Sequence, residues 1–190
     1  MKKSVFPVII FVLMLLTSFQ GYSQEFSNNQ NLTKKEKKEA RKAGLYANYK
    51  AIDTLIQNRT FVLEAQFLQG RYGDQVPVSS QINFIRVNSS QVTMQTGNNY
   101  NASIGYNGLG GVTAEGTINN YRVTSDDKKM NHTIFLTTIT QIGTYDITLR
   151  VGADATATAT ITGMSSGSLT YRGNLVAPYN SRVFKGRNSL

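Results

Sequence analysis

The stretch that decides the fold, Asn107–Thr124, reads NGLGGVTAEGTINNYRVT. Its first part is rich in glycine, at Gly108–Gly111, and predicts a turn. From Val112 onward apolar and polar residues alternate, which is the pattern of a half-buried β-strand. The alternation changes phase at Asn119-Asn120, and one extra residue in a strand is what a β-bulge supplies. The stretch therefore predicts a glycine turn that leads into a bulged strand.

The same period-two alternation continues on both sides of this stretch. It begins after Asn58-Arg59 and runs in short segments to Leu175, with turn residues between the segments. Pro77 places its own segment at a sheet edge, because proline has no amide hydrogen to donate to a ladder. Short strands joined by tight turns predict an all-β, mainly antiparallel domain over residues 58–175. We expect a sandwich or an open barrel.

One helix is predicted before the strands, over residues 33–57. Thr33 and Glu36 fit a capping box, in which each side chain bonds the other residue's backbone amide. The first half of the helix is charged, whereas the second half carries an apolar stripe at helical spacing. The stripe consists of Leu45, Tyr49, Ile52, Leu55 and Ile56. We expect it to pack on the sheet, against the alanine-lined face of the strand at 155–161.

Both ends of the chain lie outside the predicted domain. Residues 1–23 have a basic start, an apolar core at Val5–Leu16 and small residues before Gln24, which predicts a secretory signal peptide. The apolar core is shorter than the ~20 residues of a spanning helix, so we predict no transmembrane anchor in the mature form. Residues 24–32 read as a flexible leader and residues 176–190 as a basic tail. We expect a periplasmic or secreted protein.

Composition limits the possible chemistry. The chain has 190 residues, a formal net charge of +9 and no cysteine, which excludes disulfides, thiolate metal sites and lipidation of an N-terminal cysteine. Residues 33–42 hold six basic residues against two glutamates. This charge could favour an anionic surface or polymer, although a solvated helix face is the simpler interpretation. Basic and aromatic residues do not interleave as in RNA-binding sheets, so we expect no nucleic-acid partner.

Three ionisable side chains are candidates for catalysis. His132 is the only histidine, and no nucleophile or metal ligand stands at a fitting spacing, so we interpret it as a solvent-facing strand residue. Glu64 and Glu115 are carboxylates on predicted strands, and a pair ~5–10 Å apart could perform glycosidase chemistry. A hydrolase that uses this pair is the alternative function, although exposed cross-strand partners are the simpler interpretation. We predict no catalytic residue, cofactor or metal.

Four tyrosines near predicted strand ends are the candidates for a binding site. Tyr100, Tyr106, Tyr121 and Tyr171 could line the mouth of the sheet around a sugar or an apolar ligand. Packing in the core and at the rim is the alternative for these side chains. We therefore predict a non-enzymatic, monomeric envelope protein that binds an unknown small ligand or an envelope partner.

Four segments occur together in one known family. They are Asn58–Ala65 behind a basic helix, Asn83–Val87, Gly110–Thr117 and Leu169–Gly173. With the signal peptide, they make the chain resemble DUF4251, a family of small exported proteins from Bacteroidetes, over about Lys34–Leu175. The chain differs from some members in lacking a lipidation cysteine, and its glycine segment lacks the aromatic and proline residues common there. Since the family has no assigned activity, the resemblance implies fold and location only.

Overall fold

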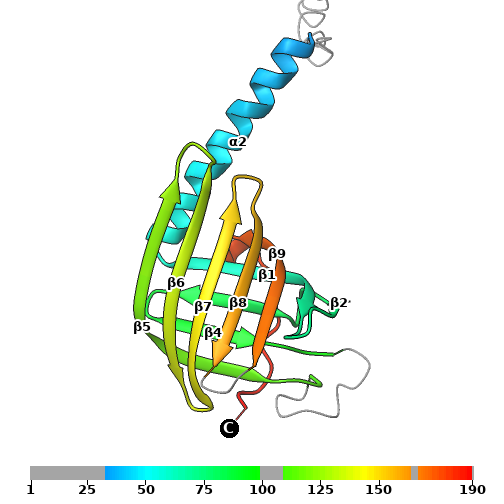
Figure 1. Ribbon diagram of the computed structural model, residues 1–190, viewed down its shortest axis with the longest axis vertical. Helices are drawn as coiled ribbons and strands as arrows, with labels where there is room; N and C mark the ends of the chain where they lie inside the picture. The colour runs from blue at the N-terminus through cyan, green and yellow to red at the C-terminus, as the bar shows by residue number, and fades with distance from the viewer. Residues whose placement is uncertain (1–32, 99–108, 164–166, 190) are drawn as a thin grey trace, which may run out of the picture. The chain divides into compact units, whose positions relative to one another are not determined.

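The computed structural model describes residues 33–98, 109–163 and 167–189. The predicted signal peptide and leader, with Tyr100 and Tyr106, lie outside these residues. The described part contains one α-helix, nine strands and one 3₁₀ turn (Figure 1). The elements are α2 (Lys34–Gln57), β1 (Thr60–Gln69), β2 (Gln75–Pro77), β3 (Phe84–Asn88), β4 (Gln91–Gln95), β5 (Thr113–Asp126), β6 (Asn131–Thr140), β7 (Gly143–Gly152), β8 (Thr156–Gly163), β9 (Ser168–Val176) and η1 (Pro178–Asn180).

Eight of the strands close into a barrel. They follow one another in the order β1-β3-β4-β5-β6-β7-β8-β9, each antiparallel to its neighbours, and β9 returns to pair with β1. The all-β antiparallel prediction is confirmed, and of its two forms the barrel is correct, although closed rather than open. β2, which holds Pro77, pairs with the end of β1 at the edge of the strand order, as expected for proline.

Closure of the barrel depends on a glycine in β9. The register of β1 against β9 shifts between Ala65 and Phe67, which is a β-bulge. Gly173 is paired with Ala65 at this point, and a Cβ on residue 173 would overlap the backbone carbonyl of Glu64. A residue without a side chain is therefore what lets the first and last strands approach closely enough to pair.

The glycine turn and the bulge predicted around β5 are both present. Gly110 has φ +71°, a left-handed conformation that glycine adopts without a steric penalty. β5 begins three residues later, at Thr113. Its register against β6 shifts between Ile118 and Asn120, which confirms the bulge. The extra residue explains how apolar residues on both sides of the bulge can face the same interior.

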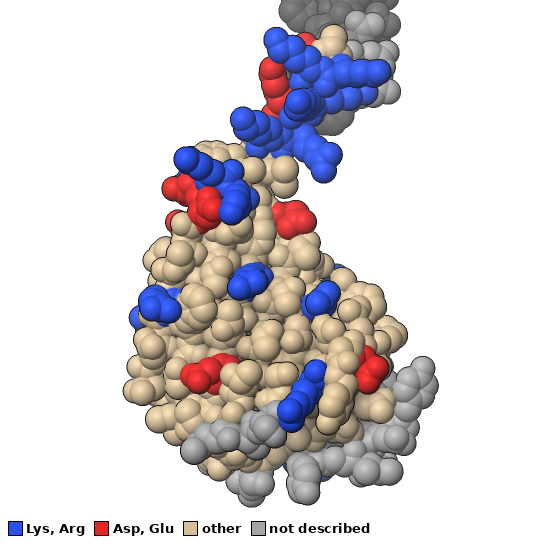
Figure 2. Space-filling model, viewed as in Figure 1, with Lys and Arg blue, Asp and Glu red and all other residues tan. Residues whose placement is uncertain are grey.

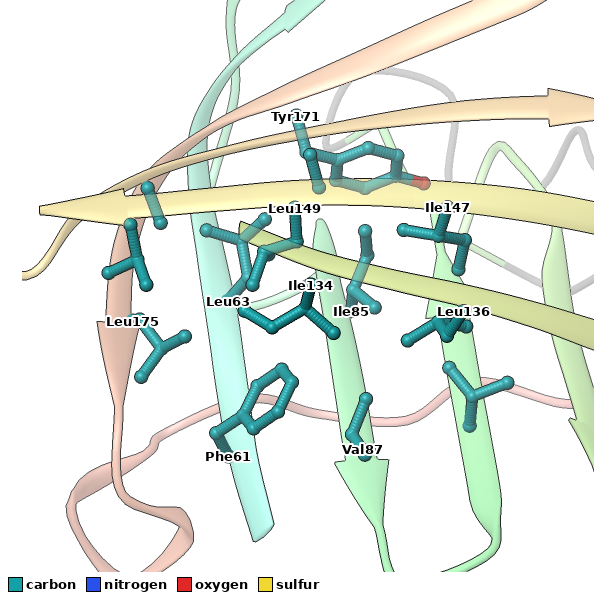
Figure 3. Close-up of a cluster of buried hydrophobic side chains, with 14 of the residues drawn as sticks. Phe61, Leu63, Ile85, Val87, Ile134, Leu136, Ile147, Leu149, Tyr171 and Leu175 are labelled. Carbon is teal, nitrogen blue, oxygen red and sulfur yellow. The ribbon is translucent and has the colours of Figure 1, made fainter. Parts of the chain in front are cut away.

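The barrel interior is a single apolar cluster, shown in part in Figure 3. Alternate residues of the strands supply it, and each large aliphatic side chain buried in this way stabilises the fold by about 1.5–3 kcal/mol. Ile52 and Ile56 of α2 belong to the same cluster and are 3% and 0% exposed. Ala157 and Ala159 of β8 are also members of this cluster. The prediction that the helical stripe packs on the sheet is therefore confirmed, whereas its placement against the alanine-lined face of β8 stays a prediction.

The chain after β9 runs along the outside of the barrel without forming a strand between η1 and Ser189. The Phe184 N–H donates to the Gln81 carbonyl, and the Ser189 N–H donates to the Thr113 carbonyl. Gln95 points outward from β4 yet is fully buried, because its amide donates to the Phe184 carbonyl and accepts from the Gly186 N–H. The basic tail is thus held by specific hydrogen bonds to β4 and β5.

Candidate functional site

The two ends of the barrel are built differently. In a barrel of consecutive antiparallel strands, successive turns lie at alternate ends. The β5–β6 and β7–β8 turns share one end with the second half of α2, because Tyr49 bonds to Asp127 and Asn48 bonds to the Ala153 carbonyl. The β6–β7 turn and the adjoining ends of β8 and β9 lie at the other end (Figure 1). The helix therefore covers one end and not the other.

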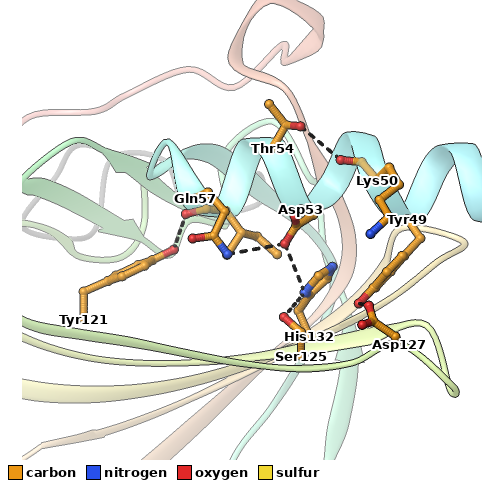
Figure 4. A network of polar contacts seen from close by, with 10 residues as sticks. Tyr49, Lys50, Asp53, Thr54, Gln57, Tyr121, Ser125, Asp127 and His132 are labelled. Atoms are coloured by element: carbon orange, nitrogen blue, oxygen red, sulfur yellow. Dashed lines mark hydrogen bonds and ion pairs between the residues drawn. The ribbon is translucent and has the colours of Figure 1, made fainter.

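A polar cluster attaches α2 to the covered end (Figure 4). The Tyr49 hydroxyl donates to Asp127 Oδ1 over 2.7 Å, and its ring stacks on His132 with the ring centroids 4.5 Å apart. Burial and the bond to Asp127 raise the pKa of Tyr49 to about 12, so its phenol keeps its proton. At the end of the helix, the Tyr121 hydroxyl donates to the Ile56 carbonyl over 2.9 Å. These bonds fix the helix over the barrel interior.

His132 is buried in this cluster, so the prediction that it faces solvent is wrong. It is 1% exposed, because it shares the inward phase of β6 with Ile134. Ser125 Oγ lies 2.8 Å and Asp53 Oδ1 3.7 Å from the same ring nitrogen, Nδ1. A catalytic triad needs the acid and the nucleophile on opposite nitrogens. The arrangement therefore orients the imidazole between helix and barrel.

The mouth at the opposite end holds a pocket of about 350 Å³. Its wall is formed by inward-facing residues of β4, β5, β8 and β9. Its rim is formed by residues that follow β4, by the region of the β6–β7 turn and by the start of β9. The apolar wall includes Met94, Ala114, Ile161, Leu169 and Tyr171, and the rim includes Thr96, Ile142, Tyr145 and Ser168. None of the described lining residues is charged. The pocket is therefore suited to an apolar group whose polar end remains at the rim.

Tyr171 presents its ring to the pocket. The hydroxyl donates to the Gln95 carbonyl over 3.2 Å, and burial raises the pKa of this phenol, so it remains neutral. Tyr145 lies nearer the rim, and its hydroxyl bonds to the Ile142 carbonyl over 3.4 Å. The two rings give the mouth flat apolar faces, with polar atoms engaged by the backbone.

Comparison with known proteins establishes the family. The sequence profile described as "Domain of unknown function (DUF4251)" matches residues 45–175. The chain belongs to the DUF4251 family. It is similar to the crystal structure of a DUF4251 family protein from Bacteroides eggerthii DSM 20697, with a TM-score of 0.60 and 30% identity over 73% of this chain and 93% of that one. No curated protein matches the chain.

Of the four tyrosines proposed from the sequence, the two that the structure describes lie at opposite ends of this DUF4251 barrel. Tyr171 lines the mouth, whereas Tyr121 lies under α2, with the Arg59 guanidinium 4.6 Å from its ring centroid. Tyr100 and Tyr106 lie outside the described residues. Sequence reasoning missed Tyr145, which begins the inward row of β7. Its place two residues after Gly143, the glycine that starts this strand, was the signal that could have found it.

The two carboxylates of the hydrolase alternative lie on the outer face of the DUF4251 barrel. Glu64 accepts hydrogen bonds from the Ser181 hydroxyl over 2.7 Å and from the Arg182 N–H over 3.1 Å. Glu115 is bonded to Lys185 Nζ at 2.8 Å, and this contact holds the pKa of that carboxyl below its usual value. Both carboxylates therefore serve to hold the C-terminal tail.

The distance between the Glu64 and Glu115 carboxylates also conflicts with glycosidase chemistry. Glu64 lies on β1 and Glu115 on β5, with β3 and β4 between them. At ~4.8 Å per strand, the two positions are about 14 Å apart, whereas paired glycosidase carboxylates lie ~5–10 Å apart. Glu115 lines a groove beside the tail residue Asn188, and Glu64 does not line it. The pair that the hydrolase alternative requires is therefore not assembled.

Two further properties follow from the described residues. No group of three or more histidine, aspartate or glutamate side chains among them is placed to hold a metal ion. Within the same residues, no helix combines the length and the apolarity needed to cross a membrane. The mouth pocket is thus the feature of the described domain that best fits a binding function.

Proposed function

We propose that this DUF4251 protein is an exported, monomeric, non-enzymatic binding protein whose barrel mouth takes up a small apolar or amphipathic molecule. The observation that carries the proposal is the pocket of about 350 Å³ at the mouth, whose described lining residues carry no charge. Ligand pockets typically measure ~300–1,000 Å³ and combine an apolar wall with a few polar groups. The size of this pocket, near the lower end of that range, suits a ligand with one short apolar part.

The lining favours binding over catalysis. General acid–base catalysis requires a titratable side chain within reach of the substrate, and the described lining offers threonine, serine and tyrosine hydroxyls among apolar residues. Of the two tyrosines, Tyr171 uses its hydroxyl to donate a hydrogen bond to a backbone carbonyl. Such groups orient a bound molecule without exchanging protons with it.

Export is supported by the sequence alone. Residues 1–23 carry the basic, apolar and small-residue pattern of a signal peptide. A domain without cysteine is stabilised independently of the redox state of its compartment, which suits a protein that folds after export. Sequencing the N-terminus of the protein recovered from the periplasm or the medium tests this part: cleavage before Gln24 is expected.

The binding proposal is tested with N-phenyl-1-naphthylamine, a neutral probe that fluoresces in apolar surroundings. Leu169→Trp fills the pocket from β9, and Arg172→Trp places the same side chain on the outer face of the same strand. Both variants carry one tryptophan, since the natural chain has none. We expect Leu169→Trp to weaken probe binding at least tenfold and Arg172→Trp to change it less than twofold. Equal affinities in the two variants would rule out the mouth as the binding site.

A further inference from the structure

The first half of α2 carries a concentration of positive charge. The segment Lys34–Lys42 contains six basic residues and two glutamates. Figure 2 shows lysine and arginine side chains gathered along this part of the helix, whereas charges of both signs are mixed at the upper end of the barrel and scattered singly below it. The positive charge of the described chain is therefore unevenly distributed.

The six basic residues occupy one side of the helix. At ~100° per residue, they fall within an arc of about 160°. Glu36 and Glu39 fall outside this arc. We call the six residues the basic ridge: Lys34, Lys35, Lys37, Lys38, Arg41 and Lys42. Such segregation presents a continuous cationic face to one partner.

The basic ridge is open to solvent. Every residue from Thr33 to Gly44 is exposed, and none of the six forms an ion pair with a described acidic residue. Glu36 is engaged in the cap instead, since its carboxylate accepts from the Thr33 N–H over 2.7 Å, and its own N–H donates to the Thr33 hydroxyl. The capping box thus secures the start of a helix whose cations remain available.

An exposed tyrosine adjoins the ridge. Tyr46 lies one turn beyond Lys42, is 54% exposed, and has Lys50 Nζ 5.5 Å from its ring centroid. Tyrosine is enriched at membrane–water interfaces, where its ring contacts lipid and its hydroxyl remains in water. Single-stranded nucleic acid is bound by several aromatic side chains in series, and this half of the helix offers one. The combination favours a lipid surface.

We propose that the basic ridge docks the protein on the surface of an anionic phospholipid membrane, with Tyr46 at the interface. Each lysine or arginine near such a surface strengthens adsorption about fivefold. The half-helix carries alanine and glutamate opposite the ridge rather than large apolar residues, so it adsorbs without inserting. Docking is therefore sensitive to salt, because charges at a surface are screened within ~10 Å at 0.1 M ionic strength.

A single tryptophan reports on the proposed contact. Because the chain contains no tryptophan, Tyr46→Trp gives a fluorophore at the interface, and Tyr72→Trp gives a matched control at a tyrosine that is 89% exposed next to β2. Vesicles of phosphatidylcholine with phosphatidylglycerol should shift the emission of Tyr46→Trp to shorter wavelength and leave that of Tyr72→Trp unchanged. A shift at Tyr72→Trp alone would overturn the assignment.

Charge removal tests the ridge itself, in the Tyr46→Trp background. One variant replaces Lys34, Lys38 and Lys42 by glutamine. The control replaces three exposed arginines of the barrel by glutamine as well. The control positions are Arg86, Arg150 and Arg172. Each variant loses three charges and has the same N-terminus, so any contribution of residues 1–32 cancels. We expect at least tenfold weaker vesicle binding for the ridge variant and less than twofold for the control.

Three outcomes would overturn the proposal. One is equal weakening in the ridge and control variants, which would mean that net charge alone drives adsorption. Another is equal binding to phosphatidylcholine vesicles that contain no anionic lipid. The last is binding to heparin or to single-stranded DNA that is tighter than binding to the anionic vesicles, which would assign the ridge to a soluble polyanion. Circular dichroism of each variant confirms that the barrel is intact.

Discussion

At one end of the barrel α2 lays Tyr49, Ile52 and Ile56 over the interior, and all three are at most 3% exposed. At the other end the pocket rim includes Ile142, which is 37% exposed, and half-buried Tyr145. Apolar side chains thus line both ends, but a helix desolvates one set while the other set remains accessible. The comparison indicates that the covered end contributes mainly to stability and the mouth is available for a ligand.

The tyrosine hydroxyls at the two ends of the barrel also differ in the hydrogen bonds that they make. Under the helix, Tyr121 bonds the backbone of α2 over 2.9 Å, and Tyr49 bonds Asp127 over 2.7 Å. At the mouth, the Tyr145 hydroxyl makes an exposed contact of 3.4 Å within its own turn. Hydrogen bonds between distant segments hold elements together, whereas a bond within one turn constrains few residues.

The largest expected difference between the ends comes from introducing a carboxylate. Ile52→Asp loses buried apolar area and places a charge in the core without a partner, which should lower the free energy of unfolding by about 4 kcal/mol or more. Ile142→Asp makes the same change at the exposed rim, and should lower it by about 1 kcal/mol or less. Urea unfolding measures both. Similar free energies of unfolding for wild type and Ile52→Asp would contradict the packing of α2.

The next effect is a pH dependence confined to the covered end. Burial lowers the pKa of His132 below its usual 6.5, although Asp53 and Asp127 oppose this. The unfolded chain then binds a proton at higher pH than the folded chain, so stability is full above pH 6.5 and falls as the pH drops below it. The slope is at most ~1.4 kcal/mol per pH unit.

His132→Phe isolates this contribution. The phenyl ring preserves the stack on Tyr49 and removes the titrating group. We expect its free energy of unfolding to vary less than that of wild type between pH 7.5 and pH 5, measured by urea titration at each pH. Parallel curves for the two proteins would show that His132 does not titrate differently in the folded and unfolded chains.

A smaller difference is expected when each end loses one hydroxyl. Tyr121→Phe leaves the Ile56 carbonyl without this donor in a partly buried site, and should cost about 1–1.5 kcal/mol. Tyr145→Phe removes a long, exposed contact and should cost about 0.5 kcal/mol or less. Thermal unfolding of the two variants gives the comparison. A larger loss for Tyr145→Phe would mean that the mouth is held more firmly than its contacts indicate.

The smallest effect is expected from removing the basic half of the helix. Residues Thr33–Arg41 are exposed and do not belong to the core cluster. Deletion of residues 24–41 should therefore change the free energy of unfolding by about 0.5 kcal/mol or less. Loss of cooperative unfolding in this variant would show that the covered end needs more than the second half of α2.

Much of the fold could be predicted from local sequence. The phase of β5, its bulge, and the stripe of α2 depend on neighbouring residues in the chain, since the side chains of strands and helices have fixed periods. His132 was misjudged because it is the second residue of β6, after a polar turn, where the pattern indicates solvent. Its burial depends on Tyr49, which stacks on it from the helix.

The candidate site was predicted only in part, for the same reason. Tyr171 and Tyr121 are both inward-facing tyrosines, and no local feature tells which end of the barrel each will reach. That assignment depends on which turns share an end with α2. The roles of Glu64 and Glu115 likewise depend on a tail that lies far away in sequence, which binds both.

The sequence by itself determined the β-rich domain, the position of the helix and most of the residues that face inward, because these follow from the geometry of single elements. The tertiary structure decided that the sheet closes, that the helix covers one end and that a pocket remains at the other. Closure rests on β1 meeting β9 across Gly173, a contact between the two ends of the domain. Contacts of that kind form between residues far apart in the chain, and local periodicity contains no information about them.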